Sequence, residues 1–343
     1  MLFYRDSEKA DPFSRIYGHP QWLFPYELPL PEFPLMIDME ITNHCNLDCI
    51  FCSRQLMSRK QGVMDFGVFT KIIDEVAPYG TGIRISGWGE PFLHPRVVEM
   101  AEYAHAKEVT VQVTTNATIM SEERAERIVR SGLDELRFSM QGLNKHHYEE
   151  MRLRGRFEQF VHNVKLVHAV RERLGARTPF LTMQTTVLTT DWAEKTPEEY
   201  RDEWLPYVDK VSVDNTFFTY VEHLERVKRY LPHQGFEQQY GPCVDIAIKM
   251  FINWQGTVQW CVQDYEGVLH ALGNLREMSI REAWHHERLE RQRERVGRNL
   301  EHASLPFCKK CYSVTTKYEE LKEKAREGGA APVAVAVQQG GAA

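Results

Sequence analysis

The sequence predicts an α/β fold: a partial (β/α)6 barrel followed by a small cysteine-rich domain. Three observations lead to this prediction. Strand-like and helix-like segments alternate with short connections from residue 34 to residue 214, which is typical of parallel strands. The alternation gives six units, fewer than the eight that close a full barrel. All seven cysteines fall into two groups, one directly after the first predicted strand and one after residue 240.

Each predicted strand is a short apolar run that ends in turn residues or at a glycine. The first, PLMIDMEIT, leads directly into the first cysteine group. The six strands are expected at residues 34–42, 81–86, 109–114, 134–139, 180–188 and 208–213. Because ligands bind beyond the C-terminal ends of parallel strands, the first cysteine group is expected in the active-site region.

The helices between these strands are indicated by apolar residues at helical spacing and by their capping residues. Ser121 is a predicted N-cap, and Gly132 is predicted to end the same helix. The main helices are expected at residues 66–77, 95–107, 122–131, 155–174 and 197–205.

The composition is ordinary for a globular protein and excludes several classes of function. Of 343 residues, 43% are hydrophobic and 26% are charged. The net charge of −6 predicts no basic surface, so nucleic acid is not an expected partner. No apolar run approaches the ~18 residues of a membrane span, and the charged N-terminus lacks a signal-peptide core. We therefore expect a cytoplasmic protein with no membrane partner.

The chain is long enough for one large domain and a smaller appendage. We expect an N-terminal extension at residues 1–33, a barrel at 34–214, a linker at 215–240, a cysteine-rich domain at 241–315, and a C-terminal helix with a disordered tail at 316–343. The tail is predicted to be disordered because its last sixteen residues are uncharged and rich in glycine and alanine.

The first cysteine group, Cys45, Cys49 and Cys52, predicts an iron–sulfur cluster. Three thiolates can hold three irons of a [4Fe–4S] cube, which leaves the fourth iron open to an outside ligand. A zinc site is the alternative, but it needs a fourth ligand, and His44 adjoins Cys45 too closely to bridge to the same ion without strain. Disulfides are not expected in a cytosolic chain of this size.

This C-x3-C-x2-C run, with Phe51 before its last cysteine, resembles the signature of the radical S-adenosylmethionine (SAM) enzymes. The resemblance implies that the amino and carboxylate groups of SAM chelate the open iron. The run GWGEP after the second strand is similar to the family's GGEP motif, which contacts the SAM amino group. Trp88 replaces the first glycine, so the contact is expected from Gly89 and Glu90.

Further SAM-contacting residues are implied by the same resemblance. Ser139 begins the run SMQG, which is similar to the family's S-x-D-G run near the SAM ribose and carboxylate, although Gln141 replaces the aspartate. An arginine in the region that follows pairs with the SAM carboxylate in relatives. Of the two arginines there, Arg152 and Arg154, we expect Arg154 to do so. Asn116, after the third strand, is expected in the same pocket or in a turn.

The second group, Cys243, Cys261, Cys308 and Cys311, provides four thiolates, enough for a zinc ion or a second [4Fe–4S] cluster. The order of a cysteine, G-x4-C, LGN, a helix and C-x2-C resembles the SPASM/twitch extension of radical SAM enzymes. The resemblance implies one auxiliary cluster, because full SPASM domains carry more cysteines. We therefore expect two [4Fe–4S] clusters and SAM as cofactors.

The resemblance implies an oxidoreductase whose 5′-deoxyadenosyl radical abstracts hydrogen from a small hydroxylated substrate, a sugar, cyclitol or nucleoside. The twitch-containing cyclitol dehydrogenases are the most similar in kind. Because all seven cysteines are assigned to clusters, none remains to return a hydrogen atom, which favours oxidation of an alcohol to a ketone with the auxiliary cluster as electron acceptor. A flavodoxin- or ferredoxin-type protein is the expected electron donor. No catalytic residue is assigned, but Asp214 and Asn215 are candidates for binding hydroxyls, for acting as a base, or for capping a helix.

Three other functions stay open at this point. A redox-neutral dehydratase, decarboxylase or epimerase would begin with the same radical. A peptide or protein maturase is less expected, because residues 1–33 are too short for the leader-binding domain that such relatives often carry. The third is a non-catalytic zinc or electron-transfer protein.

Overall fold

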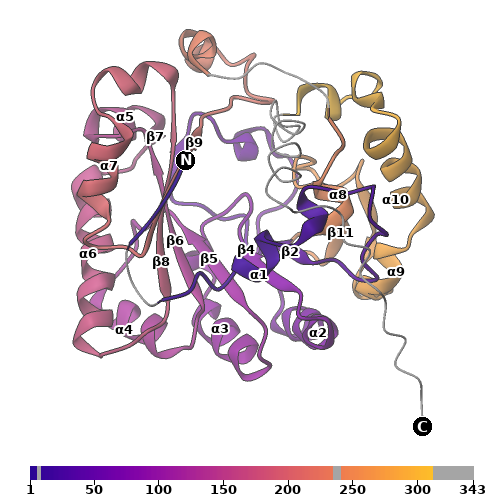
Figure 1. Ribbon diagram of the computed structural model, residues 1–343, viewed down its shortest axis with the longest axis horizontal. Coiled ribbons are helices and arrows are strands. Elements are labelled where there is room, and N and C mark those ends of the chain that lie inside the picture. The colour runs from indigo at the N-terminus through magenta and orange to yellow at the C-terminus, as the bar shows by residue number, and fades with distance from the viewer. Residues whose placement is uncertain (6–8, 235–240, 312–343) are drawn as a thin grey trace.

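The computed structural model describes residues 1–5, 9–234 and 241–311 (Figure 1). Within these ranges a ten-stranded sheet and a small two-stranded ladder carry the fold. Part of the predicted linker, 235–240, and the predicted C-terminal helix and tail, 316–343, lie outside the described residues. No helix in the described part of the chain is long and apolar enough to cross a membrane.

The six predicted barrel strands form one parallel sheet in sequence order. Every neighbouring pair in the series β2-β4-β5-β6-β8-β9 is parallel, and no pairing joins β2 to β9 in the described residues. These strands are β2 (Met36–Met39), β4 (Gly82–Ile85), β5 (Val111–Thr115), β6 (Glu135–Gln141), β8 (Phe180–Val187) and β9 (Lys210–Asn215). The predicted α/β class with a partial barrel is thereby confirmed.

The helices between the barrel strands lie outside them, along the lower and left sides in Figure 1, whereas the helices after residue 240 lie on the right. Their core-facing residues are buried, for example Phe69 and Ile72 in the first long helix. The helices are α1 (Ser14–Tyr17), α2 (Phe66–Val76), α3 (Val97–Ala106), α4 (Glu122–Arg130), α5 (Lys145–Met151), α6 (Phe157–Arg173), α7 (Pro197–Trp204), α8 (Asp245–Ile248), α9 (Ile280–Trp284) and α10 (Glu287–Gln292). Ser121 caps α4 through a bond from the Arg124 amide, as predicted.

Both edges of the six-stranded sheet are extended by chain segments that we had not expected to contribute strands. β1 (Leu2–Tyr4) pairs antiparallel with β9. β10 (Lys249–Ile252) pairs parallel with β2, and β11 (Thr257–Gln259) and β12 (Ala271–Asn274) continue from it antiparallel. The cysteine-rich segment is therefore joined to the barrel by backbone pairing beside the strand that precedes the first cysteine group.

A buried ion pair fastens α6 to the start of β9. Arg171 and Asp209 are 0% and 2% exposed, and their second contact joins Nη2 to Oδ1 at 3.2 Å. Asp209 also accepts a bond from the Leu181 amide, and Arg171 donates to the Pro179 carbonyl. We expect Arg171→Leu to lower the free energy of unfolding by about 3–5 kcal/mol, because the buried carboxylate would keep only the more distant cation of Lys9, at 3.6 Å.

Urea denaturation of the two variants Arg171→Leu and Arg173→Leu would check this expectation. Arg173 lies on the same helix, but its side chain is 53% exposed, so its loss should change stability by less than about 1 kcal/mol. Equal losses in the two variants would contradict the role of the buried pair.

Candidate functional site

The first three cysteines lie together on the loop that follows β2. Two residues of this loop form the short strand β3 (Asp48–Cys49), which pairs antiparallel with β7 (Arg152–Leu153). Burial raises the pKa of all three thiols, that of Cys52 to about 12, and the nearby Cys49 and Cys45 add to the shift at Cys52. Iron in a bound cluster would supply the cations that offset the burial and mutual repulsion of three thiolates. The donor set therefore fits a cluster bound by three cysteines.

The GWGE segment after β4 holds this loop in place. A Cβ atom on Gly89 would lie 2.1 Å from the Thr42 carbonyl oxygen, so only glycine permits this close approach. The next residue, Glu90, donates its amide to the His44 carbonyl at 2.8 Å. The predicted pair Gly89 and Glu90 is thus brought against the cluster loop.

The Glu90 carboxylate, 2% exposed, joins its own segment to the end of β5. Its oxygens accept bonds from the Phe92 amide, the Thr115 hydroxyl and the Asn116 amide at 3.1, 2.8 and 2.7 Å. Burial raises the pKa of Glu90 although these donors oppose the shift. The side chain acts as an internal brace in this structure, a role that the sequence motif did not indicate.

Asn116 is brought to the same place. Its side chain donates to Asn46 Oδ1 at 2.9 Å, and Asn46 in turn donates to Thr118 at 2.7 Å. Because Asn46 follows Cys45 directly, these bonds orient the cluster loop. Asn116 also forms the turn that we gave as the alternative to a place in the pocket, because its Oδ1 atom accepts a hydrogen bond from the Thr118 amide.

The structure separates the two candidate arginines. Arg152 is 6% exposed and donates to the Ser139 hydroxyl at 2.7 Å, while Arg154 is exposed with φ of 70°. The charge of Arg152 also acts on Cys49, where it opposes the effect of burial on the thiol pKa. Arg152 thus links Ser139 to the cluster loop. The side chain of Arg154, which we predicted to bind SAM, is directed to solvent. Strand alternation could not have separated the two, because residues two apart share one face of a strand; they differ because β7 ends at Leu153 and the chain turns at Arg154.

We expect Arg152→Leu to lower the rate of SAM cleavage about 10–100-fold, the range typical of residues that support a metal site. Its loss would remove the cation beside Cys49 and the donor to Ser139. The assay is 5′-deoxyadenosine formation by the reconstituted, dithionite-reduced protein. Arg154→Leu is the matched control and should stay within about threefold of the unchanged protein, as expected for an exposed charge. The reverse order of the two variants would instead support Arg154, the residue predicted from the sequence.

Gln141, which stands where relatives have aspartate, does not face this site. Its amide donates to the Thr186 carbonyl and to the Thr216 hydroxyl at 2.8 and 2.6 Å. Gln141 therefore ties together the ends of β6, β8 and β9.

The four remaining cysteines line one cavity, together with the aromatic residues Tyr220, Trp260, His270 and Phe307. Burial raises the pKa of the Cys243, Cys261 and Cys308 thiols, and the charge of Cys311 adds to each shift. Among the described residues no three His, Cys, Asp or Glu side chains are grouped as ligands of a single metal ion. Four cysteines around one cavity fit a [4Fe–4S] cluster, because a cube distributes its thiolates over different irons.

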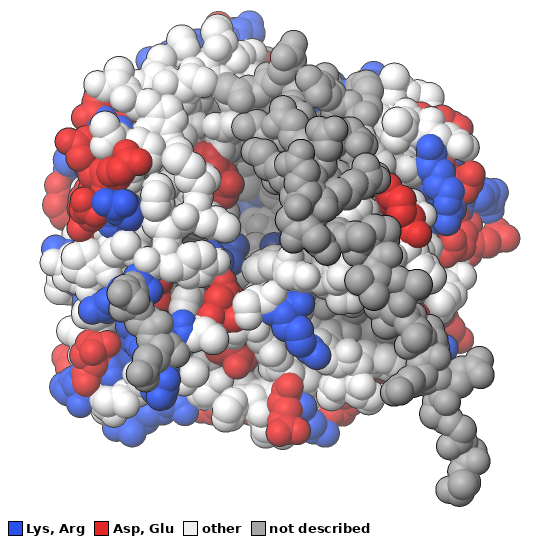
Figure 2. Space-filling view, viewed as in Figure 1, with Lys and Arg blue, Asp and Glu red and all other residues white. Residues whose placement is uncertain are grey.

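Two cavities lie between the cysteine groups. One, of about 610 Å³, borders Cys52, and the other, of about 350 Å³, extends into the barrel. They share four lining residues: Gly87, Trp88, Gln184 and Gln263. The surface is hollowed near the centre of the face in Figure 2. We call the two cavities together the chamber.

The inner part of the chamber is lined by ion pairs and amides rather than by apolar side chains. Arg84 contacts Asp38 at 2.5 Å, and Lys249 bridges Asp38 and Asp245 at 3.3 and 3.1 Å. The pKa of Asp38 is lowered, because these two cations outweigh the effect of its burial. Further polar lining residues are Ser86, Gln112, Thr114, Arg137 and Gln184. Such groups can donate to and accept from many hydroxyl groups.

Asp214 and Asn215, at the end of β9, line the part of the chamber nearest Cys52. Gln184 donates to Asp214 Oδ2 at 3.3 Å. Asp214 and Asn215 are both exposed, so they lie at the rim of the chamber.

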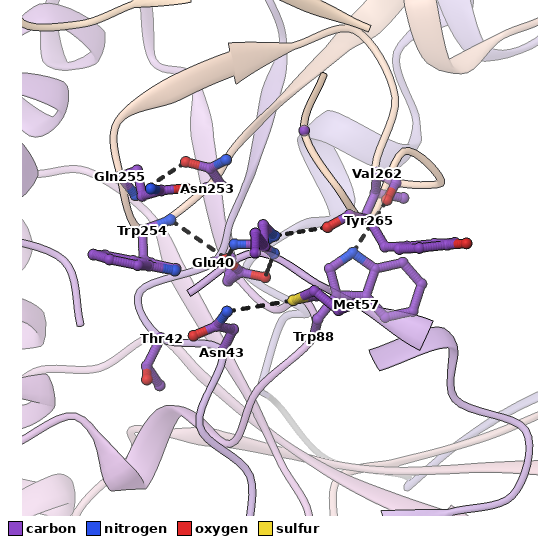
Figure 3. Close-up of polar contacts among 12 residues, drawn as sticks. Glu40, Thr42, Asn43, Met57, Trp88, Asn253, Trp254, Gln255, Val262 and Tyr265 are labelled. Carbon is purple, nitrogen blue, oxygen red and sulfur yellow. Dashed lines mark hydrogen bonds and ion pairs between the residues drawn. The ribbon is translucent and has the colours of Figure 1, made fainter. Parts of the chain in front are cut away.

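A polar joint connects the cluster loop to the cysteine-rich domain (Figure 3). Arg59 binds both carboxylate oxygens of Glu40 at 2.7 and 2.5 Å and donates to the Tyr265 carbonyl at 2.7 Å. The Trp254 amide contacts Glu40 at 3.5 Å. Glu266 accepts bonds from the Ser58 and Arg59 amides. Sequence reasoning had not identified these residues, because they are distant in the chain.

Comparisons with known proteins agree with this geometry. The radical SAM superfamily profile matches residues 39–185, and that of the SPASM iron–sulfur cluster-binding domain matches residues 243–312. The tungsten-containing aldehyde ferredoxin oxidoreductase cofactor-modifying protein of Pyrococcus furiosus is 34% identical over 104 residues, which are 30% of this chain and 29% of that protein. The alignments span 29–39% of the lengths of the first three curated relatives.

Two solved structures share the fold. BtrN in complex with AdoMet and 2-DOIA has a TM-score of 0.52 at 14% identity, covering 82% of this chain and 93% of that chain. Streptococcus suis SuiB bound to precursor peptide SuiA has a TM-score of 0.56 at 16% identity, covering 93% and 80%. At these identities the likeness establishes the architecture alone.

Proposed function

Because the chain is a radical SAM enzyme with a C-terminal SPASM iron–sulfur domain, we propose that it oxidises an alcohol of a small hydroxylated molecule to a ketone. The observation that carries the proposal is the polar chamber between the two cysteine groups. Its two parts, of about 350 and 610 Å³, have the size of a small-molecule site. Their donors and acceptors suit a sugar, cyclitol or nucleoside.

We assign Cys45, Cys49 and Cys52 to the cluster that binds SAM, and Cys243, Cys261, Cys308 and Cys311 to one auxiliary cluster. When bound, these groups supply one-electron cleavage of SAM, a 5′-deoxyadenosyl radical that abstracts hydrogen, and an acceptor for one electron. A flavodoxin- or ferredoxin-type protein would provide the electron for cleavage.

The protein's own residues orient the reactants. Gly89 lets the backbone approach the cluster loop, and Arg152 places a cation near Cys49 for the SAM carboxylate. In the chamber, Gln184 and the Asp38–Arg84 pair would bind substrate hydroxyls. Asp214, at the rim, would accept the hydroxyl proton when the ketone forms. The polar joint of Arg59 and Glu40 keeps the cysteine-rich domain against the barrel.

A peptide substrate is the second candidate. It is favoured by the exposed rim at Asp214 and Asn215, through which a side chain of a larger molecule could enter the chamber.

The test is anaerobic turnover of the reconstituted protein with a panel of sugars, cyclitols and nucleosides, followed by mass spectrometry. Oxidation predicts a product two mass units lighter than the substrate, formed in about equal amount to 5′-deoxyadenosine. Cys261→Ala is the matched variant, which should still cleave SAM but form little ketone. A product of unchanged mass, or one lighter by a water molecule, would contradict oxidation and favour the redox-neutral alternatives. Turnover of peptides alone would favour a maturase.

A further inference from the structure

Trp88 occupies the boundary between the chamber and the auxiliary cysteines. Its side chain lines both parts of the chamber, and its indole N–H donates to the Val262 carbonyl at 3.2 Å (Figure 3). Its ring also meets Tyr265 edge-on at 6.2 Å between centroids. Trp88 thus connects the substrate side of the barrel to the residue that follows Cys261.

Residues 261–263, to which Trp88 is hydrogen-bonded, separate the chamber from the four-cysteine cavity. Cys261 lines the four-cysteine cavity, and the Gln263 amide donates to its Sγ atom at 3.4 Å. The Gln263 side chain is 5% exposed and borders both parts of the chamber as well as the four-cysteine cavity. A group in the chamber beside Trp88 is therefore separated from the Cys261 sulfur only by one hydrogen bond and two residues of backbone.

We propose that Trp88 and the Val262–Cys261 backbone to which it binds are the route by which an electron leaves the substrate for the auxiliary cluster. The inference rests on the proposed oxidation. After one hydrogen atom has passed from the substrate carbon to the 5′-deoxyadenosyl radical, the remaining carbon radical loses one electron and the hydroxyl loses one proton. The electron reduces the oxidised auxiliary cluster along this route, the proton passes to a carboxylate or to water, and the C=O bond forms.

Because Trp88 lies at the chamber wall, its side chain can span the wall toward the auxiliary cysteines. Glycine, which relatives have at this place in the motif, offers neither an N–H group nor a ring to span the chamber wall. The route is also short, because the accepting carbonyl belongs to the residue directly after Cys261. Trp88 thus acts as a coupling residue between two sites rather than as a ligand of either.

The test compares Trp88→Phe with Trp254→Phe. Phenylalanine at position 88 keeps an aromatic ring but removes the bond to Val262. The ring of Trp254 packs against Gly62 and lines neither part of the chamber, so Trp254→Phe controls for a general loosening of the contact between the cysteine-rich domain and the barrel. We expect the ketone formed per 5′-deoxyadenosine to fall about tenfold in Trp88→Phe, a barrier difference of ~1.4 kcal/mol, and to stay unchanged in Trp254→Phe.

Two readouts separate coupling from a structural role. Freeze-quench EPR should detect an accumulated substrate carbon radical in Trp88→Phe and not in Trp254→Phe. The midpoint potential of the auxiliary cluster and the iron content should be the same in both variants.

Three results would overturn the inference. These are an unchanged ketone yield in Trp88→Phe, an equal loss in the two variants, and a loss of about half the iron in Trp88→Phe, which would make Trp88 a support of the cluster. Failure of the proposed function is distinguishable, because the unsubstituted protein would then form no oxidised product at all.

Discussion

The Cys52→Ala variant is expected to lose reductive SAM cleavage completely while it keeps the auxiliary cluster. Cys52 belongs to the loop whose three thiols lie close together, away from the four-cysteine cavity. Two remaining thiolates do not hold a site-differentiated cube, so 5′-deoxyadenosine should fall below detection. Iron should fall from about eight to about four per chain after anaerobic reconstitution.

Cys261→Ala is the complementary variant. It should also bind about four irons, but it should still form 5′-deoxyadenosine, because the first group is intact. If Cys52→Ala kept SAM cleavage, or if Cys261→Ala abolished it with the first cluster still present, the assignment of the two groups would be wrong. About four irons and one zinc in the unsubstituted protein would remove the electron acceptor and favour a redox-neutral reaction.

The second large effect is expected from Glu90→Gln. The carboxylate accepts from two backbone amides and one hydroxyl in a buried position. A glutamine would place an NH₂ group against one of these donors, and that donor would lose its partner. We expect the free energy of unfolding to fall by about 2–4 kcal/mol, with weaker SAM binding because the same bonds position the cluster loop.

Urea denaturation of the apoprotein measures the stability, and calorimetric titration of the reconstituted protein measures SAM binding. Glu99→Gln is the matched control, because Glu99 pairs only with Arg96 at the surface; its effect should be below about 1 kcal/mol. A Glu90→Gln protein as stable as this control would show that the brace has no energetic importance.

Much of the fold could be predicted from the sequence alone. The alternation of apolar strands with amphipathic helices located all six parallel strands to within a few residues, because strand and helix periods are local properties. It did not show that β1 and β10 extend the sheet. Each of these two short strands depends on a partner that lies more than 200 residues away in the chain, and β1 has only three residues.

The same division holds for the candidate site. The spacing of Cys45, Cys49 and Cys52 sets their chemistry, since eight residues of chain keep any three thiols close. The choice between Arg152 and Arg154 required the tertiary structure, in which Arg152 pairs with Cys49 in the β3–β7 ladder and the chain turns away at Arg154 with φ of 70°.

The sequence by itself determined the architecture, the two cysteine groups and the motif residues beside them, because each depends on local spacing. Only the tertiary structure decided how these parts meet. The Glu40–Arg59 joint, the bond from Trp88 to Val262 and the shared chamber all bring together side chains from distant segments. Such contacts are set by the packing of the whole chain, which no local pattern records.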